Sequence, residues 1–303
     1  MAPLLATAAL WPVMVEARPR PAHGGKRPSP AVLAGQPNPA LWRISDRDTT
    51  IYLFGTLHAL PKDLRWQSRT LIRVVAASDT LMTESVGERA ATDAFDGKIA
   101  PQNLPPIGER VSKSHRAALA RFADDLPVPA IKLLDGLPTW IVAMSVGFVR
   151  EYRTGAVRGP GADDWLEQRF RAKRKKIVSI EDGRTALAAV NAIPESEQRK
   201  MLEAALDAPM PTLEGLRAPA RAWAAGDVTA ASPLATALRI TDANTALDAR
   251  LIGDRNRAWA ATLEARLAHP GTILFAGGIA HFIGDASVLT LLKQRGIQVT
   301  RIR

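Results

Sequence analysis

The chain has 303 residues, of which 47% are hydrophobic and 23% charged, so it can bury a substantial core and is not disordered as a whole. It contains no cysteine, which excludes disulfides, thiolate nucleophiles and cysteine-held metal ions. Its formal net charge of +10 is spread along most of the chain, and no zinc-finger, RNA-binding or recognition-helix motif accompanies it, so we expect no nucleic-acid partner.

The chain begins with an apolar run, Met1–Val15, that is too short to span a membrane. The triplet Val15-Glu16-Ala17 has the small residues of a signal-peptidase site, although no basic residue precedes the apolar run. We therefore expect residues 1–17 to be a signal peptide and the protein to be periplasmic or secreted, with no transmembrane segment. Residues 18–39 are rich in Pro, Gly and Ala without periodicity, which predicts a disordered linker.

Ordered structure is predicted from residue 40 onward and begins with a hairpin. The hairpin consists of strands at 40–44 and 50–54. A helix at 68–78 follows, and then a third strand at 80–85. The second strand leads into Gly55-Thr56-Leu57-His58, and the third ends at Glu84. Because a right-handed crossover makes these two strands parallel, their carboxyl ends meet at one edge of a sheet, where ligand sites form. We therefore expect His58 and Glu84 to lie close together.

The middle of the chain, about residues 100–245, is predicted to be largely helical. Its helices fall between breaks that contain Pro or Gly, at 112–123, 138–149, 163–174, 195–206 and 219–225. One convincing strand, 176–181, interrupts them and ends in Glu181. Asp163 opens one of these helices, where it suits an N-cap as well as it suits a functional site.

The last third of the chain returns to strands. A long helix is predicted from about residue 242 to 268 and carries Arg255 and Asn256. A strand at 272–277 then delivers Gly278-Ile279-Ala280-His281, and a helix at 287–295 and a strand at 297–302 follow. Together the elements predict an α/β (α+β) fold over residues 40–303, a single domain whose central mixed sheet has a largely helical region inserted between its halves.

Two strand ends share the signature Gly-x-x-His, at Gly55–His58 and Gly278–His281. A lone histidine after a strand is more often a hydrogen-bonded structural residue, and a lone strand-end glutamate is often a helix cap. A matched pair of imidazoles with Glu84 at the same sheet edge instead favours a divalent-metal site, because two histidines and a carboxylate leave positions open for water and substrate.

Further polar residues could support such a site. Glu181 or Asp163 could act as a general base or orient a histidine. Arg255 could clamp an anion or stabilise an oxyanion, although the spacing alone favours an ordinary surface ion pair with Asp254 or a neighbouring acid. The sequence has no nucleophile elbow, phosphate loop, dinucleotide fingerprint or HExxH helix.

Taken in order, these motifs resemble the TraB/GumN family, which is similar in fold and in its paired Gly-x-x-His motifs to the Tiki proteases. The matching segments are 55–58, Glu84, 255–256 and 278–285, together with a middle motif from Gly161 to Glu181. Asp182 stands where the family has a threonine, so a hydroxyl role there is not expected. The resemblance covers about residues 41–302.

The resemblance implies an α/β fold of two related sheet-and-helix halves and a metal-dependent hydrolytic site. It places His58, Glu84 and His281 around a divalent ion such as Mn²⁺ or Co²⁺. Arg255 and Asn256 would lie beside that ion. The residues assigned to the surrounding binding loops are Gly55, Gly278, Asp163 and Asp285.

The expected function is that of an exported metal-dependent hydrolase of the peptidase type, which acts on a peptide, a protein or a polysaccharide-related substrate. Glu84 or Glu181 would handle the proton of the attacking water, and Arg255 would stabilise the oxyanion. The alternative is a non-catalytic protein on the same scaffold that binds a peptide or a polysaccharide. The two differ in geometry, because a shared ion requires ring nitrogens of His58 and His281 to lie near each other.

Overall fold

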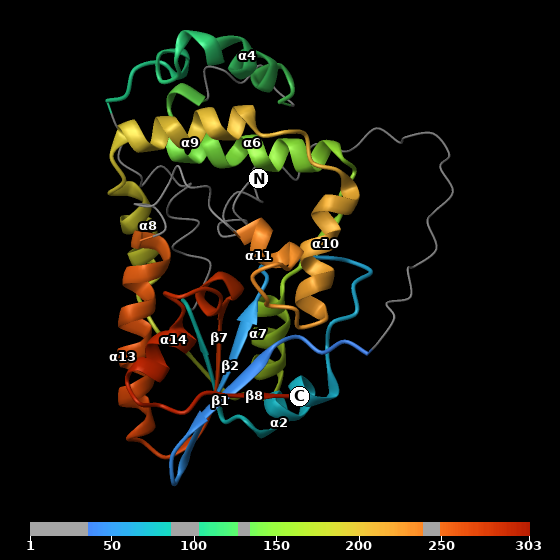
Figure 1. Ribbon diagram of the computed structural model, residues 1–303, viewed down its shortest axis with the longest axis vertical. Coiled ribbons are helices and arrows are strands. Elements are labelled where there is room, and N and C mark those ends of the chain that lie inside the picture. Colours follow the sequence, from blue (N-terminus) through green and yellow to red (C-terminus); the bar gives the residue numbers. More distant parts are fainter. Residues whose placement is uncertain (1–35, 86–102, 127–133, 239–248) are drawn as a thin grey trace.

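The computed structural model of the protein describes residues 36–85, 103–126, 134–238 and 249–303 (Figure 1). The predicted signal peptide and most of the predicted linker lie outside the described residues. The beginning of the predicted helix at 242–268 also lies outside them.

A six-stranded mixed sheet, in the order β6-β4-β7-β2-β1-β8, forms the centre of the fold. Its strands are β1 (Leu41–Ser45), β2 (Thr49–Thr56), β4 (Thr80–Thr83), β6 (Lys176–Ser179), β7 (Gly271–Gly278) and β8 (Thr300–Ile302). Strands β6, β4, β7 and β2 run parallel, whereas β1 pairs antiparallel with both β2 and β8. A second, two-stranded antiparallel sheet joins β3 (Ala59–Pro61) to β5 (Arg158–Pro160). The predicted mixed α/β fold and its first hairpin are therefore confirmed.

Helices surround the sheet and form a separate layer above it in Figure 1, where α4, α6 and α9 lie together. The α-helices are α2 (Arg69–Ala77), α4 (Arg116–Asp124), α6 (Thr139–Arg153), α7 (Ala162–Ala172), α8 (Arg184–Asn191), α9 (Glu195–Asp207), α10 (Leu213–Ala224), α11 (Pro233–Leu238), α13 (Arg255–Leu267) and α14 (Val288–Gln294). The 3₁₀ turns are Ile107–Glu109, Lys113–His115 and Ile279–Phe282, and a π-helical turn, Ala249–Asp254, precedes α13.

Helix starts follow the local sequence where a capping side chain is present. The hydroxyl of Ser68 accepts the N–H of Leu71 at 3.1 Å, so α2 begins within a residue of its predicted start. The predicted helix at 219–225 was wrong in its start, because α10 begins six residues earlier, after the N-cap Thr212. Proline and glycine were expected to mark breaks between helices, whereas Pro219 lies inside α10.

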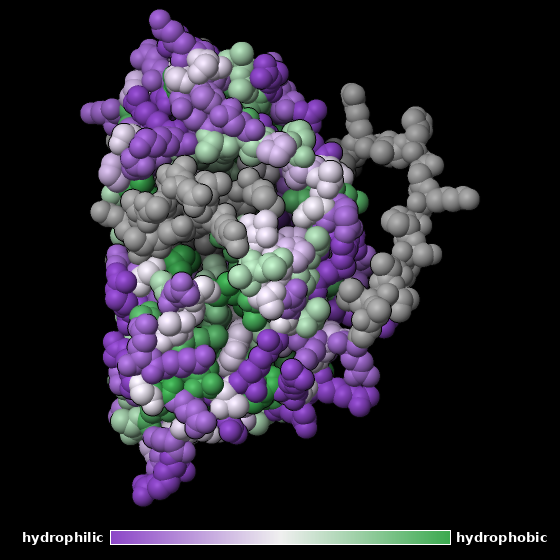
Figure 2. All heavy atoms as spheres, viewed as in Figure 1, coloured by the Kyte–Doolittle hydropathy of each residue, from purple (hydrophilic) through white to green (hydrophobic). Residues whose placement is uncertain are grey.

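The main hydrophobic core lies around the parallel strands. Residues 273–278 of β7 are all buried, as is typical of a central parallel strand with both faces covered. A second cluster joins α4, α6 and α9 through side chains such as Phe122, Val146 and Leu202. On the face shown in Figure 2, hydrophilic residues occupy most of the periphery and hydrophobic ones gather lower down, over the sheet. Within the described ranges, no helix is both long and apolar enough to cross a membrane.

Strand register determines which residues meet at the carboxyl edge of the sheet. Thr56 of β2 pairs with Gly278 of β7, and on the other side of β7 Thr83 pairs with Ala276. Beyond β4, Thr83 also pairs with Ser179 of β6. The segments that follow β2, β4, β6 and β7 therefore emerge side by side at one edge.

Candidate active site

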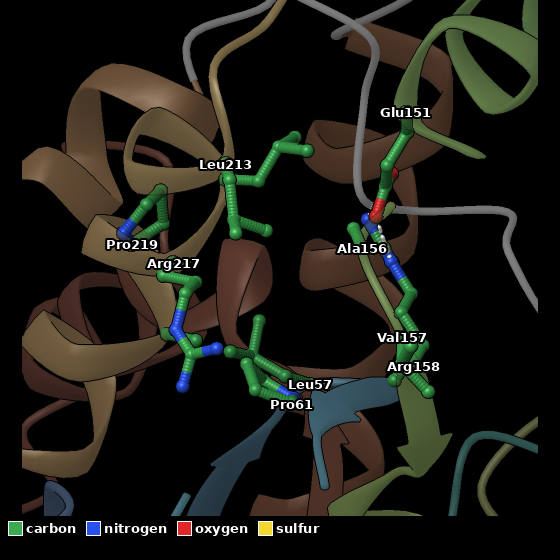
Figure 3. Close-up of a pocket in the computed structure, with 12 residues that line it drawn as sticks. Leu57, Pro61, Glu151, Ala156, Val157, Arg158, Leu213, Arg217 and Pro219 are labelled. Carbon is green, nitrogen blue, oxygen red and sulfur yellow. Dashed lines mark hydrogen bonds and ion pairs between the residues drawn. The ribbon is translucent and has the colours of Figure 1, made fainter. Parts of the chain in front are cut away.

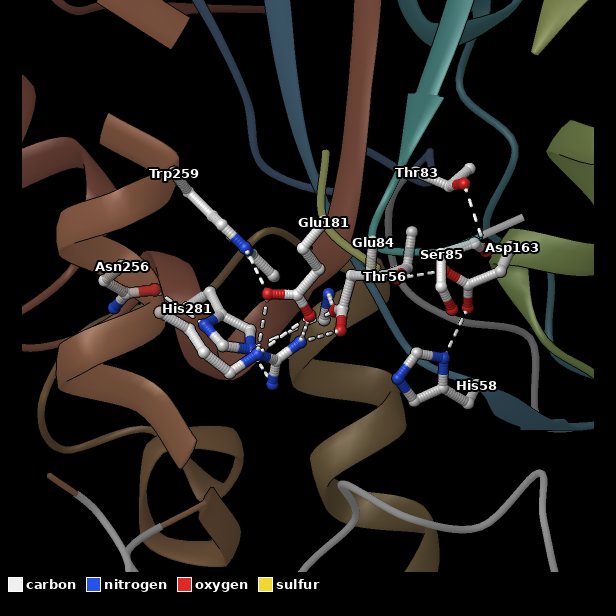
Figure 4. A network of polar contacts seen from close by, with 12 residues as sticks. Thr56, His58, Thr83, Glu84, Ser85, Asp163, Glu181, Asn256, Trp259 and His281 are labelled. Carbon is white, nitrogen blue, oxygen red and sulfur yellow. Dashed lines mark hydrogen bonds and ion pairs between the residues drawn. The ribbon is translucent and has the colours of Figure 1, made fainter. Parts of the chain in front are cut away.

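Polar side chains from four adjacent strand ends and from helix α13 converge in one network (Figure 4). The strand ends contribute His58 after β2, Glu84 after β4, Glu181 after β6 and His281 after β7. Helix α13 begins at this edge, so its first residues reach the same place. The sequence therefore predicted correctly that His58, Glu84 and His281 share a sheet edge.

His58 is held by a carboxylate from helix α7. Its Nδ1 lies 2.9 Å from Oδ2 of Asp163, whose other oxygen accepts the hydroxyl of Thr56 at 2.6 Å. The charge of Asp163 raises the pKa of His58 to about 9, although burial opposes the shift. The N-cap interpretation of Asp163 is wrong, since Gly161 is the N-cap and Asp164 accepts its N–H at 2.7 Å. Because the pair uses Nδ1, the other ring nitrogen of His58, Nε2, points away from Asp163.

Asp163→Asn is expected to lower the pKa of His58 substantially in the metal-free protein. The folded-state pKa of about 9 exceeds the ordinary 6.5, so the pair stabilises the fold fully below about pH 6.5 and loses that contribution as the pH rises through 9. The difference in free energy of unfolding between wild type and Asp163→Asn should therefore shrink as the pH is raised across this window. NMR titration of the imidazole and urea unfolding at both limits measure the two effects, and a pKa of His58 that stays near 9 in the variant contradicts the assignment.

Glu84 lies between the two histidines, and both of its oxygens are engaged. Oε1 accepts a hydrogen bond from the backbone N–H of Gly278 at 2.5 Å, and Oε2 accepts one from Nη2 of Arg255 at 2.7 Å. Burial by itself would raise the pKa of Glu84, but the positive charges of His281, Arg255 and His58 outweigh it and hold that pKa at about 2. Glu84 is therefore an anion throughout the neutral pH range.

Arg255 is the central cation of the network, and its side chain is only 8% exposed. It donates from Nη2 to Oε1 of Glu181 at 2.6 Å and from Nε to the same oxygen at 2.9 Å. The second oxygen of Glu181 accepts the indole N–H of Trp259 at 2.8 Å. The surface-pair interpretation of Arg255 is wrong, because Asp254 pairs with Arg257 instead.

His281 is fully buried and is oriented through its Nδ1, which lies 2.6 Å from Oδ1 of Asn256. The amide nitrogen of Asn256 donates to the carbonyl of Ala286 at 2.8 Å, which fixes the orientation of that amide. Burial lowers the pKa of His281 to about 4, so its ring is neutral near pH 7. The ring of Trp259 packs on it with a centroid separation of 4.2 Å.

A small cradle lies where Gly278 has no side chain. The position of a Cβ on Gly278 would be 3.2 Å from Oε1 of Glu84, 3.5 Å from Nε2 of His58 and 3.8 Å from Cδ2 of His281. A ring nitrogen of His58 and a ring carbon of His281 are therefore near one point, and each histidine has an outer partner of the kind that orients metal ligands. In the described part of the chain, however, no three His, Asp or Glu side chains form a metal-binding group as they stand. The donor types present, two imidazoles and a carboxylate, are of the kind that bind divalent ions.

Of the other two predicted site residues, Gly55 packs against the 3₁₀ turn that carries His281, whereas Asp285 lies outside the network. Gly55, at the end of β2, lies against Ile279, so close that a Cβ there would be 2.3 Å from the Ile279 Cδ1 atom. Asp285 is exposed in the turn after His281, and among the described residues its carboxylate makes no hydrogen bond or ion pair with the network.

Two residues of the network escaped the sequence analysis, namely Thr56 and Trp259. Trp259 follows Arg255 by four residues, which places both on one helix face, so the spacing could have indicated it. Thr56 stands inside the Gly-x-x-His tetrapeptide, but its hydroxyl partner lies 107 residues away in sequence.

A separate pocket opens beside the segment that carries His58 (Figure 3). Its apolar lining includes Leu57, Ala59, Leu213 and Pro219. Its charged residues are paired, since Arg158 binds Glu151 and Arg217 binds Asp63. The pocket is therefore apolar in character and distinct from the polar network.

Comparison with known proteins agrees with this arrangement of motifs. A sequence model described as the TraB/PrgY/gumN family matches residues 40–301. No curated protein and no solved structure matches the chain. The matched range includes both Gly-x-x-His strand ends and all four strand-end segments of the network, and the chain therefore belongs to the TraB/PrgY/gumN family.

Proposed function

We propose that the protein is a metal-dependent hydrolase that cleaves a peptide or amide bond at the carboxyl edge of the sheet. The observation that carries the proposal is the cradle at Gly278, which has Nε2 of His58 at 3.5 Å and Oε1 of Glu84 at 3.2 Å from one point, with His281 beside it. Two neutral imidazoles and a carboxylate are a common ligand set for a catalytic divalent ion. Such an ion, when bound, lowers the pKa of water and polarises a carbonyl oxygen.

His58, Glu84 and His281 would hold the ion in this proposal. Glu84 is ready for that role because its pKa of about 2 keeps it anionic. Asp163 and Asn256 hold the two imidazoles through Nδ1 and leave Nε2 as the ligating atom. Because the pKa of His58 is about 9, Nε2 of His58 must lose its proton when it becomes a ligand, and binding is accompanied by proton release.

The two glutamates then act through charge rather than as proton acceptors. A general base works best when its pKa is near the working pH, and the pKa of Glu84 lies far below it. Glu181 uses both oxygens to bind Arg255 and Trp259, so its carboxylate fixes the arginine. Arg255, anchored in this way, would present positive charge to an oxyanion that develops on the substrate.

A chelation experiment tests the proposal. Protein stripped with EDTA should lose hydrolysis of a quenched-fluorescence peptide library and regain it on addition of Mn²⁺ or Co²⁺, and calorimetry should detect binding of the added ion. A stripped protein that binds neither ion and a purified protein that cleaves no peptide in their presence would overturn the proposal.

A second candidate is a non-catalytic protein that binds a peptide or a polysaccharide at the same edge. The observation that favours it is that Arg255 forms ion pairs with both Glu84 and Glu181, so the negative charge of these carboxylates is already compensated without an ion. Ligand binding by calorimetry without release of any cleavage product, in protein supplied with Mn²⁺ and Co²⁺, would favour this candidate over the hydrolase.

A further inference from the structure

The guanidinium of Arg255 contacts two of the three side chains assigned to the ion. Its Nη2 donates to Glu84 at 2.7 Å, and its Nη1 lies 3.3 Å from Nε2 of His281. The contact with His281 is buried and the contact with Glu84 is partly buried, and the arginine lies over the ring of Trp259 with its Cζ 4.8 Å from the centroid. A permanent cation therefore occupies part of the position that a divalent ion needs.

The contact with His281 uses the atom that ligation requires. Oδ1 of Asn256 can only accept a hydrogen bond, so Nδ1 of His281, at 2.6 Å, carries the proton. In the neutral ring, the lone pair then resides on Nε2, which faces an N–H donor of Arg255. A lone pair that accepts a hydrogen bond cannot ligate an ion at the same time.

The geometry also provides a way for the arginine to release His281. Nε and Nη2 of Arg255 both bind Glu181, at 2.6 to 2.9 Å, and this carboxylate is the firmer anchor. The contact from Nη1 to His281 is the longer one, at 3.3 Å. A small rotation of the guanidinium would therefore free Nε2 while the anchor to Glu181 remains.

We propose that Arg255 competes with the divalent ion for His281 and Glu84, so that it acts as an internal cation that must withdraw before the site is loaded. This inference rests on the proposed metal-dependent function. Its consequence is a site with two states, one in which Arg255 neutralises the network and one in which the ion does. Removal of the guanidinium should therefore strengthen metal binding, although it removes a residue beside the ion.

Calorimetric titration of stripped protein with Mn²⁺ alone tests this competition. Arg255→Gln is expected to bind Mn²⁺ about tenfold or more tightly than wild type, because one repelling positive charge and one competing donor are removed at short range. Arg257→Gln is the matched control, since it removes an exposed arginine two positions along the same helix and should change the dissociation constant less than about twofold. Circular dichroism and thermal unfolding establish that each variant is folded.

Arg255→Lys provides the second variant if Arg255→Gln does not fold. One ammonium can pair with Glu181 but cannot also donate to Glu84 and His281, so a smaller rise in affinity is expected. Equal or weaker Mn²⁺ binding in the folded Arg255 variants, with binding in wild type, overturns the competition and leaves the metal-dependent function standing. Mn²⁺ binding in an Arg255 variant but not in wild type supports competition between Arg255 and the ion. If no protein binds Mn²⁺, both this competition and the metal-dependent function are overturned.

Discussion

Replacement of His58 and His281 together by alanine is expected to abolish metal-dependent hydrolysis. Loss of an outer partner of a metal ligand already costs about 10- to 100-fold in affinity or activity, so loss of two ligands should exceed about 100-fold. Mn²⁺ should also stop raising the melting temperature. For wild type at about 100 times the dissociation constant, binding to the folded state alone adds roughly 2.7 kcal/mol of stability. Peptide cleavage and thermal unfolding with and without Mn²⁺ measure both effects.

His269→Ala is the control for this double variant, because His269 is exposed and lies at the opposite end of β7 from His281. It should retain both the activity and the Mn²⁺-dependent shift of wild type. His281 also packs on Trp259, so the double variant is expected to be less stable than the control. A double variant that still cleaves peptides at a rate within tenfold of wild type would exclude these histidines as ligands.

The sheet edge could be predicted from sequence because it depends on local patterns. β-branched and aromatic runs that stop at glycine predicted β2 and β7, and the crossover rule predicted that β2 and β4 run parallel. The register adds a detail that no local pattern contains, since Gly55 pairs with Gly277 rather than with Gly278. The two Gly-x-x-His copies are therefore offset by one residue across the sheet.

The identity of each partner depended on tertiary contacts that sequence spacing does not define. Arg255 could equally have faced solvent, because the phase of helix α13 relative to the sheet is set by packing of Trp259 and Leu263, which are both buried. Asp163 is separated from His58 by 105 residues, and only the close contact of α7 with the end of β2 brings them together. The long-range pairs therefore had to come from the structure.

That contact between α7 and the end of β2 depends on Gly161. A Cβ at this position would lie 2.3 Å from the carbonyl oxygen, 2.4 Å from the carbonyl carbon and 2.6 Å from Cα of His58. The neighbouring N–H of Ala162 donates to the carbonyl of Leu57 at 2.9 Å, so a backbone hydrogen bond joins the start of the helix to the strand end beside the contact. Since all three atoms belong to the backbone, no rotamer change can relieve the overlap.

Gly161→Ala is therefore expected to destabilise the protein and to displace His58. Overpacking of this kind costs about 1–3 kcal/mol, and a backbone clash falls at the upper end or beyond, so the melting temperature should fall by several degrees. Hydrolysis should fall by about 100-fold at temperatures where the variant is folded, because a shift of about 1 Å in a reacting group has that effect. Thermal unfolding and peptide cleavage measure these changes.

Gly108→Ala is the matched control, since a Cβ there would have no atom within 4 Å. It makes the same chemical change in the chain and should leave both the melting temperature and the cleavage rate close to those of wild type. If Gly161→Ala behaved like this control, the contact between α7 and the end of β2 could not be what positions His58. The orientation of the imidazole would then have to come from Asp163 and Thr56 alone, and Asp163→Asn would carry the whole effect.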